Sequence, residues 1–152
     1  MAVIFCWGMS HATATAQISN LQAKVTRVTP GVAYYRGSHT PSVLRQGEIL
    51  QPGDVIDTGR NGRVVIKLGD GSQVTIFPGS SVELRNFQAG GSWRDLLNVT
   101  VGRVRATINH VKRPNPYRVF SPIASIAVRG TDFLVIVEQN GETRVLVYEG
   151  LV

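Results

Sequence analysis

The sequence predicts an all-β domain of short antiparallel strands and hairpins, with little helix. Apolar and polar residues alternate with a period of two in one segment after another from about residue 20 onward. Such alternation places one face of a strand against a core and the other against water. Asp-Gly and Asn-Gly dipeptides, typical of tight hairpin turns, separate several of these segments. The 16 glycines among 152 residues also favour a fold rich in turns over a helix bundle.

The strands expected along the chain fall into two groups. Residues of the first group alternate strictly between apolar and polar, and they predict strands with one wet face over 63–68, 73–76, 82–85 and 103–108. Residues of the second group are more continuously apolar, and they predict central strands covered on both faces over 126–128, 133–137 and 145–148. The one helix candidate is a turn or two over 92–98, where Ser92 could cap.

Turn residues fall between the expected strands. Asp70-Gly71 separates 64–68 from 74–76, and Asn140-Gly141 separates 133–137 from 145–148, so both pairs of segments predict hairpins. The local patterns do not choose between a β-sandwich and a β-roll. The length and composition, with 43% hydrophobic and 17% charged residues, indicate one folded domain able to bury a core without disulfides or a metal.

The first residues indicate export. Residues 2–9 are apolar, no charged residue precedes Lys24, and Ala14-Thr15-Ala16 fits a signal-peptidase site. We therefore expect a signal peptide over 1–16, which lacks the usual basic start, then a tail over 17–24 and the β domain over 25–152. This organisation predicts a periplasmic or extracellular bacterial protein. The apolar stretch is too short to span a bilayer, and charges interrupt all later ones, so no transmembrane helix is expected.

Catalytic and metal-binding patterns are missing from the sequence. Cys6, the only cysteine, lies in the expected signal peptide, so the mature chain would have no thiol. His39 and His110 stand far apart, and no zinc-protease, nucleophile-elbow or nucleotide-binding motif occurs. Asp54 and Asp57 are expected to be turn residues, as is Asp70. We expect a non-enzymatic protein without a cofactor or metal. A glycan-active enzyme is the weakest alternative, because it would need two facing carboxylates.

Several motifs occur in a fixed order. The chain reads G-D-V-I-D-T-G over 53–59, D-G-S over 70–72, S-P-I-A over 121–124, V-R-G-T-D-F over 128–133 and V-Y-E-G over 147–150. This set resembles the FecR family, over roughly residues 25 to 152. The resemblance implies structural roles for Gly53, Asp54, Thr58, Gly59, Asp70, Gly71, Ser72, Gly130, Thr131, Phe133 and Gly150. Because Gly130 interrupts an apolar run, it also indicates a bulge or a close backbone approach.

The resemblance also bears on function. Founding members of the family carry a cytoplasmic sigma-factor-binding segment, one membrane helix and this domain in the periplasm. The present chain is similar to the stand-alone exported versions, which implies a binding or signalling module that contacts a partner through strand edges and loops. The resemblance further implies a last strand that is slightly short, since the family usually continues beyond the position of Gly150.

A basic cluster gives a second functional hypothesis. Candidate partner-binding residues, all cationic and lying in or near the expected strands and loop over 103–131, are Arg103, Arg105, Lys112, Arg113, Arg118 and Arg129. They form either a solvated basic face or a site for an anionic envelope polymer. An exported protein is not expected to meet nucleic acid, so the expected partner is an envelope protein or such a polymer.

The expected signal peptide gives the first testable prediction. Expression of the full chain in a bacterial host should yield an exported protein whose first residue is Gln17, because cleavage follows Ala16. Intact-mass analysis of the envelope fraction measures this directly. A full-length product that stays in the cytoplasm would contradict the export hypothesis.

Overall fold

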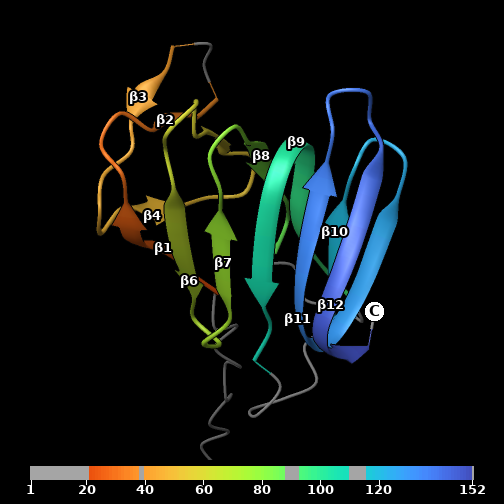
Figure 1. Cartoon of the computed structure of the whole chain (residues 1–152). Coiled ribbons are helices and arrows are strands. Elements are labelled where there is room, and N and C mark those ends of the chain that lie inside the picture. The colour runs from red at the N-terminus through yellow and green to blue at the C-terminus, as the bar shows by residue number, and fades with distance from the viewer. Residues whose placement is uncertain (1–20, 38–39, 88–92, 110–115, 152) are drawn as a thin grey trace, which may run out of the picture.

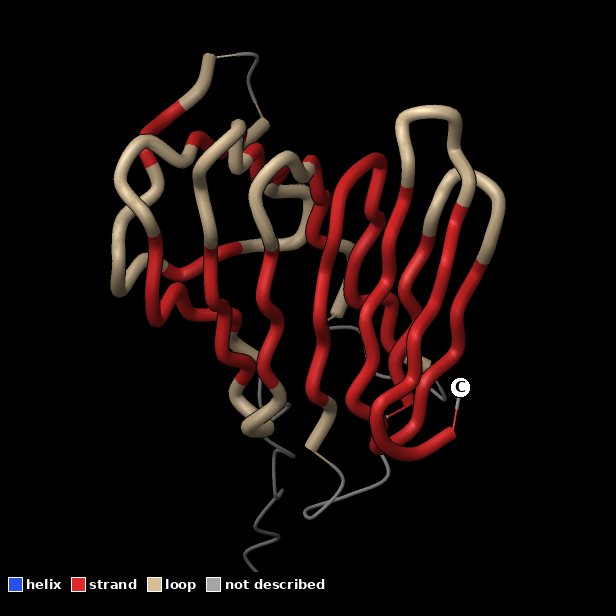
Figure 2. Tube along the Cα trace, in the orientation of Figure 1, coloured by secondary structure: helices blue, strands red, loops and turns tan. Residues whose placement is uncertain are grey.

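The computed structural model describes residues 21–37, 40–87, 93–109 and 116–151. Every regular element in these residues is a strand (Figures 1 and 2), which confirms the predicted all-β class. The twelve strands are β1 (Ala23–Val28), β2 (Ala33–Tyr35), β3 (Ser42–Val43), β4 (Ile49–Leu50), β5 (Val55–Asp57), β6 (Val64–Leu68), β7 (Gln73–Ile76), β8 (Ser81–Leu84), β9 (Arg94–Thr107), β10 (Pro116–Phe120), β11 (Ser125–Val137) and β12 (Thr143–Leu151).

The strands form one hydrogen-bonded sheet that folds over into two layers (Figure 1). The front layer in this view has the order β4-β1-β6-β7-β9-β11-β12, and the rear layer has the order β3-β2-β5-β8-β9-β10-β11. Both predicted hairpins, β6–β7 and β11–β12, are present. All pairs are antiparallel except β9 and β10, which are parallel. β9 ends in the front layer, whereas β10 lies in the rear layer beside the first half of β9.

Three strands belong to both layers. The first half of β9 pairs with β8 and β10 in the rear, and its second half pairs with β7 and β11 in front. β11 and β12 make the same passage near their own bends. A glycine with positive φ stands at each bend: Gly102 (106°), Gly130 (60°) and Gly150 (91°). A side chain at such angles costs about 1–2 kcal/mol, so glycine suits all three bends.

The core lies between the two layers and follows the predicted alternation. Val64, Ile66 and Leu68 are buried while Lys67 between them is exposed. The same pattern holds in β7, β8 and the second half of β9. The largest side chains with almost no exposed surface include Tyr117, Phe87, Phe133, Leu97 and Ile66. Period-two patterning therefore fixes which face of each of these strands turns inward.

The helix predicted over 92–98 was wrong. From Arg94 onward this segment is the first half of β9, which pairs with β8 and β10, and its Leu97 and Val99 are buried. Ser92 lies outside the described residues. Backbone pairing with two neighbouring strands outweighs the weak local helix preference, because propensity is readily overridden by tertiary contacts.

The expectation of strands covered on both faces was also wrong for two of its three segments. Ala127 is exposed between the buried Ile126 and Val128. Residues 145–148 are exposed on both faces, since β12 is an edge strand paired only with β11 among the described strands. In residues 133–137 the inward side chains are buried and the outward ones are half-buried. A continuous apolar run therefore did not distinguish a central strand from an uncovered edge.

The bend of β9 provides a stability test. An added Cβ at Gly102 would lie 2.2 Å from Ser80 Oγ and 2.4 Å from Ser80 Cα, whereas one at Gly141 would meet no atom within 4 Å. Both glycines have positive φ, so both Gly→Ala changes carry similar backbone strain. We expect Gly102→Ala to lower the free energy of unfolding by about 1–3 kcal/mol more than Gly141→Ala. Urea unfolding measures the difference, and equal losses would mean that Ser80 does not limit the bend.

Candidate functional site

The residues of the G-D-x-I-x-T-G motif hold the rear layer together. Asp54 is buried, and its carboxylate accepts hydrogen bonds from Arg36 Nε at 2.9 Å, Arg36 Nη2 at 2.7 Å and the Gln51 amide at 2.8 Å. The amide of Gly53 donates to the carbonyl of Leu84 at 2.7 Å. Asp57 instead accepts from the Gly59 amide, so the two carboxylates face different partners and serve two turns.

A chain of hydroxyl groups continues from this motif to the bend of β9. Thr58 Oγ1 donates to the Phe77 carbonyl at 2.9 Å and accepts from the Ser80 amide at 2.9 Å. Ser80 Oγ in turn accepts from the Arg103 amide at 2.9 Å. Both hydroxyl side chains are buried, and such groups are retained inside only when they are hydrogen-bonded. Ser80 carried no sequence signal beyond its place after a Pro-Gly turn.

The D-G-S motif is a hairpin turn that also anchors a neighbouring strand. Asp70 Oδ1 accepts from the Ser72 amide at 2.8 Å, as expected of an Asp in a tight turn. Asp70 Oδ2 accepts from the Tyr117 hydroxyl at 2.5 Å, and Ser72 Oγ accepts from the Asn109 amide at 3.0 Å. Burial, and the hydrogen bond to Asp70, raise the pKa of Tyr117, so the phenol stays protonated and acts as a structural donor.

The V-R-G-T-D-F and V-x-x-G motifs meet where β11 and β12 bend. An added Cβ at Gly150 would lie 2.6 Å from the Gly130 carbonyl oxygen. Thr131 Oγ1 donates to the Arg129 carbonyl at 3.1 Å, and Phe133 re-enters the core fully buried. The pairing of β11 with β12 shifts register between Arg129 and Phe133. The glycines thus let two strand backbones approach closely while both cross between layers.

The predicted basic residues do not gather on one face. Arg103 and Arg105 lie on the outer side of the front layer, whereas Arg118 and Arg129 belong to β10 and the first half of β11 in the rear layer. Arg118 forms an ion pair with Asp95 at 2.6 Å, and Arg105 forms one with Asp132 at 2.7 Å. Lys112 and Arg113 lie outside the described residues.

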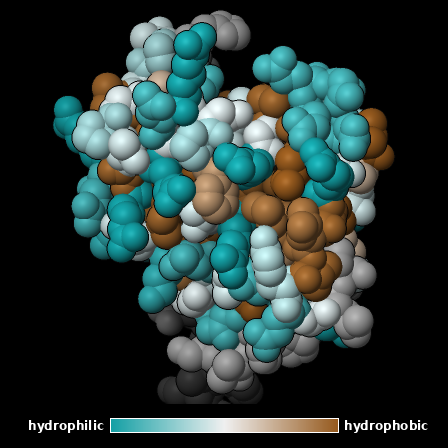
Figure 3. Space-filling model, viewed as in Figure 1, coloured by the Kyte–Doolittle hydropathy of each residue, from teal (hydrophilic) through white to brown (hydrophobic). Residues whose placement is uncertain are grey.

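The outer strand β12 exposes apolar side chains on both of its faces. Val145 and Val147 continue the core rows of Val135 and Phe133, yet they are 37% and 45% exposed. Leu146 and Tyr148 are 43% and 56% exposed. Figure 3 shows a brown patch over the area where Figure 1 places β11 and β12. Contiguous apolar exposure of this kind marks interaction surfaces.

The part of the chain described here holds no group of three or more His, Cys, Asp or Glu side chains spaced to share a metal ion. Nor does this part contain a helix with the length and apolar character needed to cross a bilayer.

The Arg105–Asp132 pair predicts a pH-dependent contribution to stability. Hydrogen bonding from Arg105 lowers the pKa of Asp132, so the stabilisation is present above the unfolded carboxyl pKa of about 3.9 and is lost as pH falls through the lower folded value. We expect Asp132→Asn to cost about 1 kcal/mol at pH 7 and much less near pH 2. Glu149→Gln is the control, because Glu149 has no ion pair among the described residues, and its urea unfolding should show no such loss at pH 7. A pH-independent cost for Asp132→Asn would contradict the assignment.

Comparison with known proteins agrees with this geometry. A family model described as FecR protein matches residues 54–152, about two thirds of the chain, and the matched range contains all five motifs except the first glycine. Neither the search of curated proteins nor the search of solved structures returned a match. The motif order, the bends that it builds and this match lead to one conclusion: the chain belongs to the FecR protein family.

Proposed function

We propose that this protein is an exported, non-catalytic binding module of the bacterial cell envelope, and that a protein partner pairs with the free edge of β12. FecR proteins are a regulatory and signalling family, which supports a role in contact rather than catalysis. The main support for the proposal is the apolar composition of the exposed strand β12. A signalling module must have a surface that recognises its partner, and β12 exposes four consecutive apolar side chains over 145–148.

The other two edge strands are short, which protects them from pairing with a further strand. β3 and β4 end the two layers on the opposite side, and each has two residues. β12 has nine residues, and its segment 145–148 contains neither a charged residue nor a proline. Proteins usually blunt long edges with charges, prolines or bulges, because free N–H and C=O groups recruit other strands. In β12 such features occur only toward its ends, with Arg144, Glu149 and the bend at Gly150, so the unblunted apolar segment 145–148 indicates that another strand covers it.

An extended polypeptide satisfies both the backbone and the side chains of this edge. A polymer without peptide groups cannot match the regular spacing of free N–H and C=O groups along β12, whereas an added strand can. One face of that strand would shield Val145 and Val147 and close the core. Its other face would pack beside Leu146 and Tyr148. The partner segment should therefore carry apolar residues on both faces over about four positions.

Site-specific crosslinking in the envelope tests the proposal. A photoreactive amino acid at Val147 should crosslink to a second protein, and the same probe at Val43, an exposed valine on β3, should not. Val145→Lys should abolish the crosslink from position 147, because a lysine placed toward the core edge opposes strand addition. Val43→Lys is the matched control and should leave the crosslink intact.

Two outcomes would contradict the proposal. Crosslinks only between two copies of this chain would assign the edge to self-association. Crosslinks of equal strength from positions 147 and 43 would mean that β12 is not a preferred contact. Once the partner is identified, hydrogen exchange should show slower exchange of the β12 amides in the complex.

A further inference from the structure

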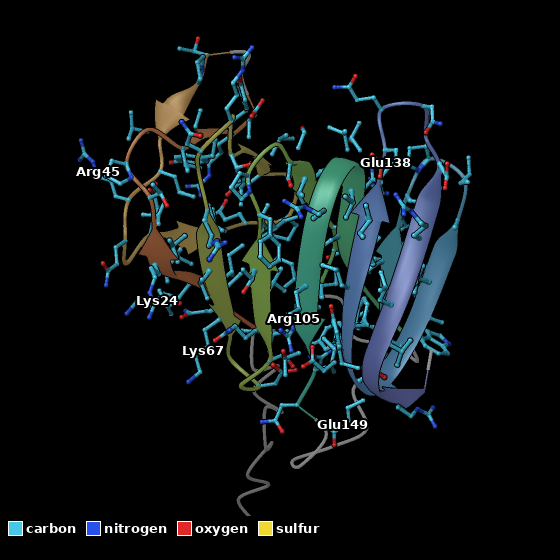
Figure 4. All side chains as sticks on the ribbon, in the orientation of Figure 1. Lys24, Arg45, Lys67, Arg105, Glu138 and Glu149 are labelled. Carbon is cyan, nitrogen blue, oxygen red and sulfur yellow. The ribbon has the colours of Figure 1, made fainter. Side chains whose placement is uncertain are left out.

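A second surface lies in the front layer, on the outer side of β1, β6, β7 and β9, with β11 between it and β12. Cross-strand pairing arranges its side chains in three rows. The first row is Lys24, Lys67, Gln73 and Thr107; the second is Arg27, Val65, Thr75 and Arg105; the third is Arg63, Phe77 and Arg103. We call the six cations of these rows the cationic face: Lys24, Arg27, Arg63, Lys67, Arg103 and Arg105. Figure 4 labels three of them on β1, β6 and β9.

The charge of this face is largely uncompensated. No acidic residue occurs in β1, β6, β7 or the second half of β9. Arg105 pairs with Asp132, whereas the other five cations have no ion pair among the described residues. The residues come from 24 to 105 in the sequence, so only the order of strands in the sheet brings them together. Five free positive charges on one flat surface create a local positive potential.

One pair on this face opposes folding. Lys24 of β1 lies directly opposite Lys67 of β6, and both side chains are exposed. Side chains at opposite positions have Cβ atoms about 4.5–5.5 Å apart, and like charges there are destabilising. A fold gains nothing from this arrangement on its own, whereas an anion placed between the two ammonium groups would be attracted by both.

Phe77 organises the third row. The guanidinium carbon of Arg63 lies 5.0 Å from the centre of the Phe77 ring, and that of Arg103 lies 5.7 Å from it. Stacking on a ring restrains a long arginine side chain and leaves its N–H groups free for bidentate binding of a carboxylate or phosphate. The two arginines are therefore held in place before any ligand binds.

We propose that the cationic face binds a linear anionic glycan, that is, a sugar polymer bearing carboxylate or phosphate groups. The face spans about 14 Å from β1 to β9, with rows about 7 Å apart, so it meets several repeats of such a polymer. Neutral hydrogen-bonding side chains stand between the cations, and Thr26, Gln73 and Thr75 line a shallow hollow of about 390 Å³ with Arg27 and Arg63. Such groups suit the hydroxyls of sugars.

Other polyanions fit this face less well. Single-stranded nucleic acid is held by bases stacked on aromatic rings, but Phe77 is the one ring in these rows and already has guanidinium groups over it. A lipid surface favours large apolar side chains that enter the bilayer, and the rows of β1, β6 and β7 offer only Val65 and Phe77, both half-buried. The experiment therefore includes one probe for nucleic acid and one for a lipid surface.

The experiment measures binding of the full chain across a salt series. The probes are polygalacturonate for carboxylate groups, phosphorylated dextran for phosphate groups, and neutral dextran as the uncharged control. An oligothymidylate and vesicles containing phosphatidylglycerol test the competing classes. One variant carries Lys24→Ser and Lys67→Ser, and another carries Arg63→Ser and Arg103→Ser. The matched control carries Arg45→Ser and Arg85→Ser, which removes two charges from exposed positions off this face.

The wild type should bind at least one charged glycan and not neutral dextran, with affinity falling as salt rises. Each face variant should bind roughly tenfold more weakly at low salt and show a salt slope smaller by roughly 1.5, since two ionic contacts are lost. The control variant should match the wild type. The lysine double variant should also unfold at a urea concentration no lower than the wild type, which separates lost binding from lost folding.

Three results would overturn the inference. If the control variant binds the glycan as weakly as the face variants do, the lost affinity follows from the change in net charge and not from this face. Stronger binding to oligothymidylate or to anionic vesicles than to both glycans would assign the face to that class instead. No binding of the wild type to either charged glycan at low salt would leave the face without this function. None of these results bears on the β12 crosslinks, because the two surfaces use different residues.

Discussion

The fold depends on the close passage of backbones where strands cross from one layer to the other. β9, β11 and β12 each contribute to both layers, and each turns at a glycine with positive φ. At Gly102 the neighbouring atoms belong to Ser80, and at Gly150 they belong to Gly130 and Thr131. A Cβ at either position would force these strands apart, and the two layers could no longer share one core.

Polar side chains join distant segments of the chain around this core. Ser80 holds the bend of β9 to Thr58, Asp54 holds Arg36 to the turn before β5, and Asp70 holds Tyr117 of β10 to the β6–β7 hairpin. Each pairing joins segments at least 18 residues apart. Because these side chains make their hydrogen bonds inside the protein, they serve the architecture. Recognition must therefore come from other, outward-facing side chains, among them Val147 and Tyr148 of the last motif.

This division explains what the sequence could predict. A period of two correctly gave the buried faces of β6, β7, β8 and the second half of β9, and Asp70-Gly71 and Asn140-Gly141 correctly gave two hairpins, since these signals are local. Whether a strand lies at an edge depends on its neighbours, so the apolar run 145–148 was mistaken for a central strand. Lys24 and Lys67 are opposite each other although 43 positions separate them in the chain, and no local pattern contains that pairing. The basic residues predicted together, Arg105 and Arg118, are nearer in sequence but belong to different layers.

Arg105 marks the boundary between the two outward surfaces of the front layer. Its guanidinium donates to both oxygens of Asp132, at 2.9 and 2.7 Å, and lies 4.7 Å from the centre of the Tyr148 ring. An anion that bound Arg105 would have to displace Asp132. It would gain little binding free energy, because Asp132 already compensates the charge of Arg105. The five unpaired cations therefore form the part of the face open to a polyanion, while Arg105 stays with β11 and β12 and holds Tyr148 beside the free edge. A partner strand on β12 and a polymer across β1 to β9 thus occupy one layer without competing for the same charge, and only the second contact should weaken steeply with salt.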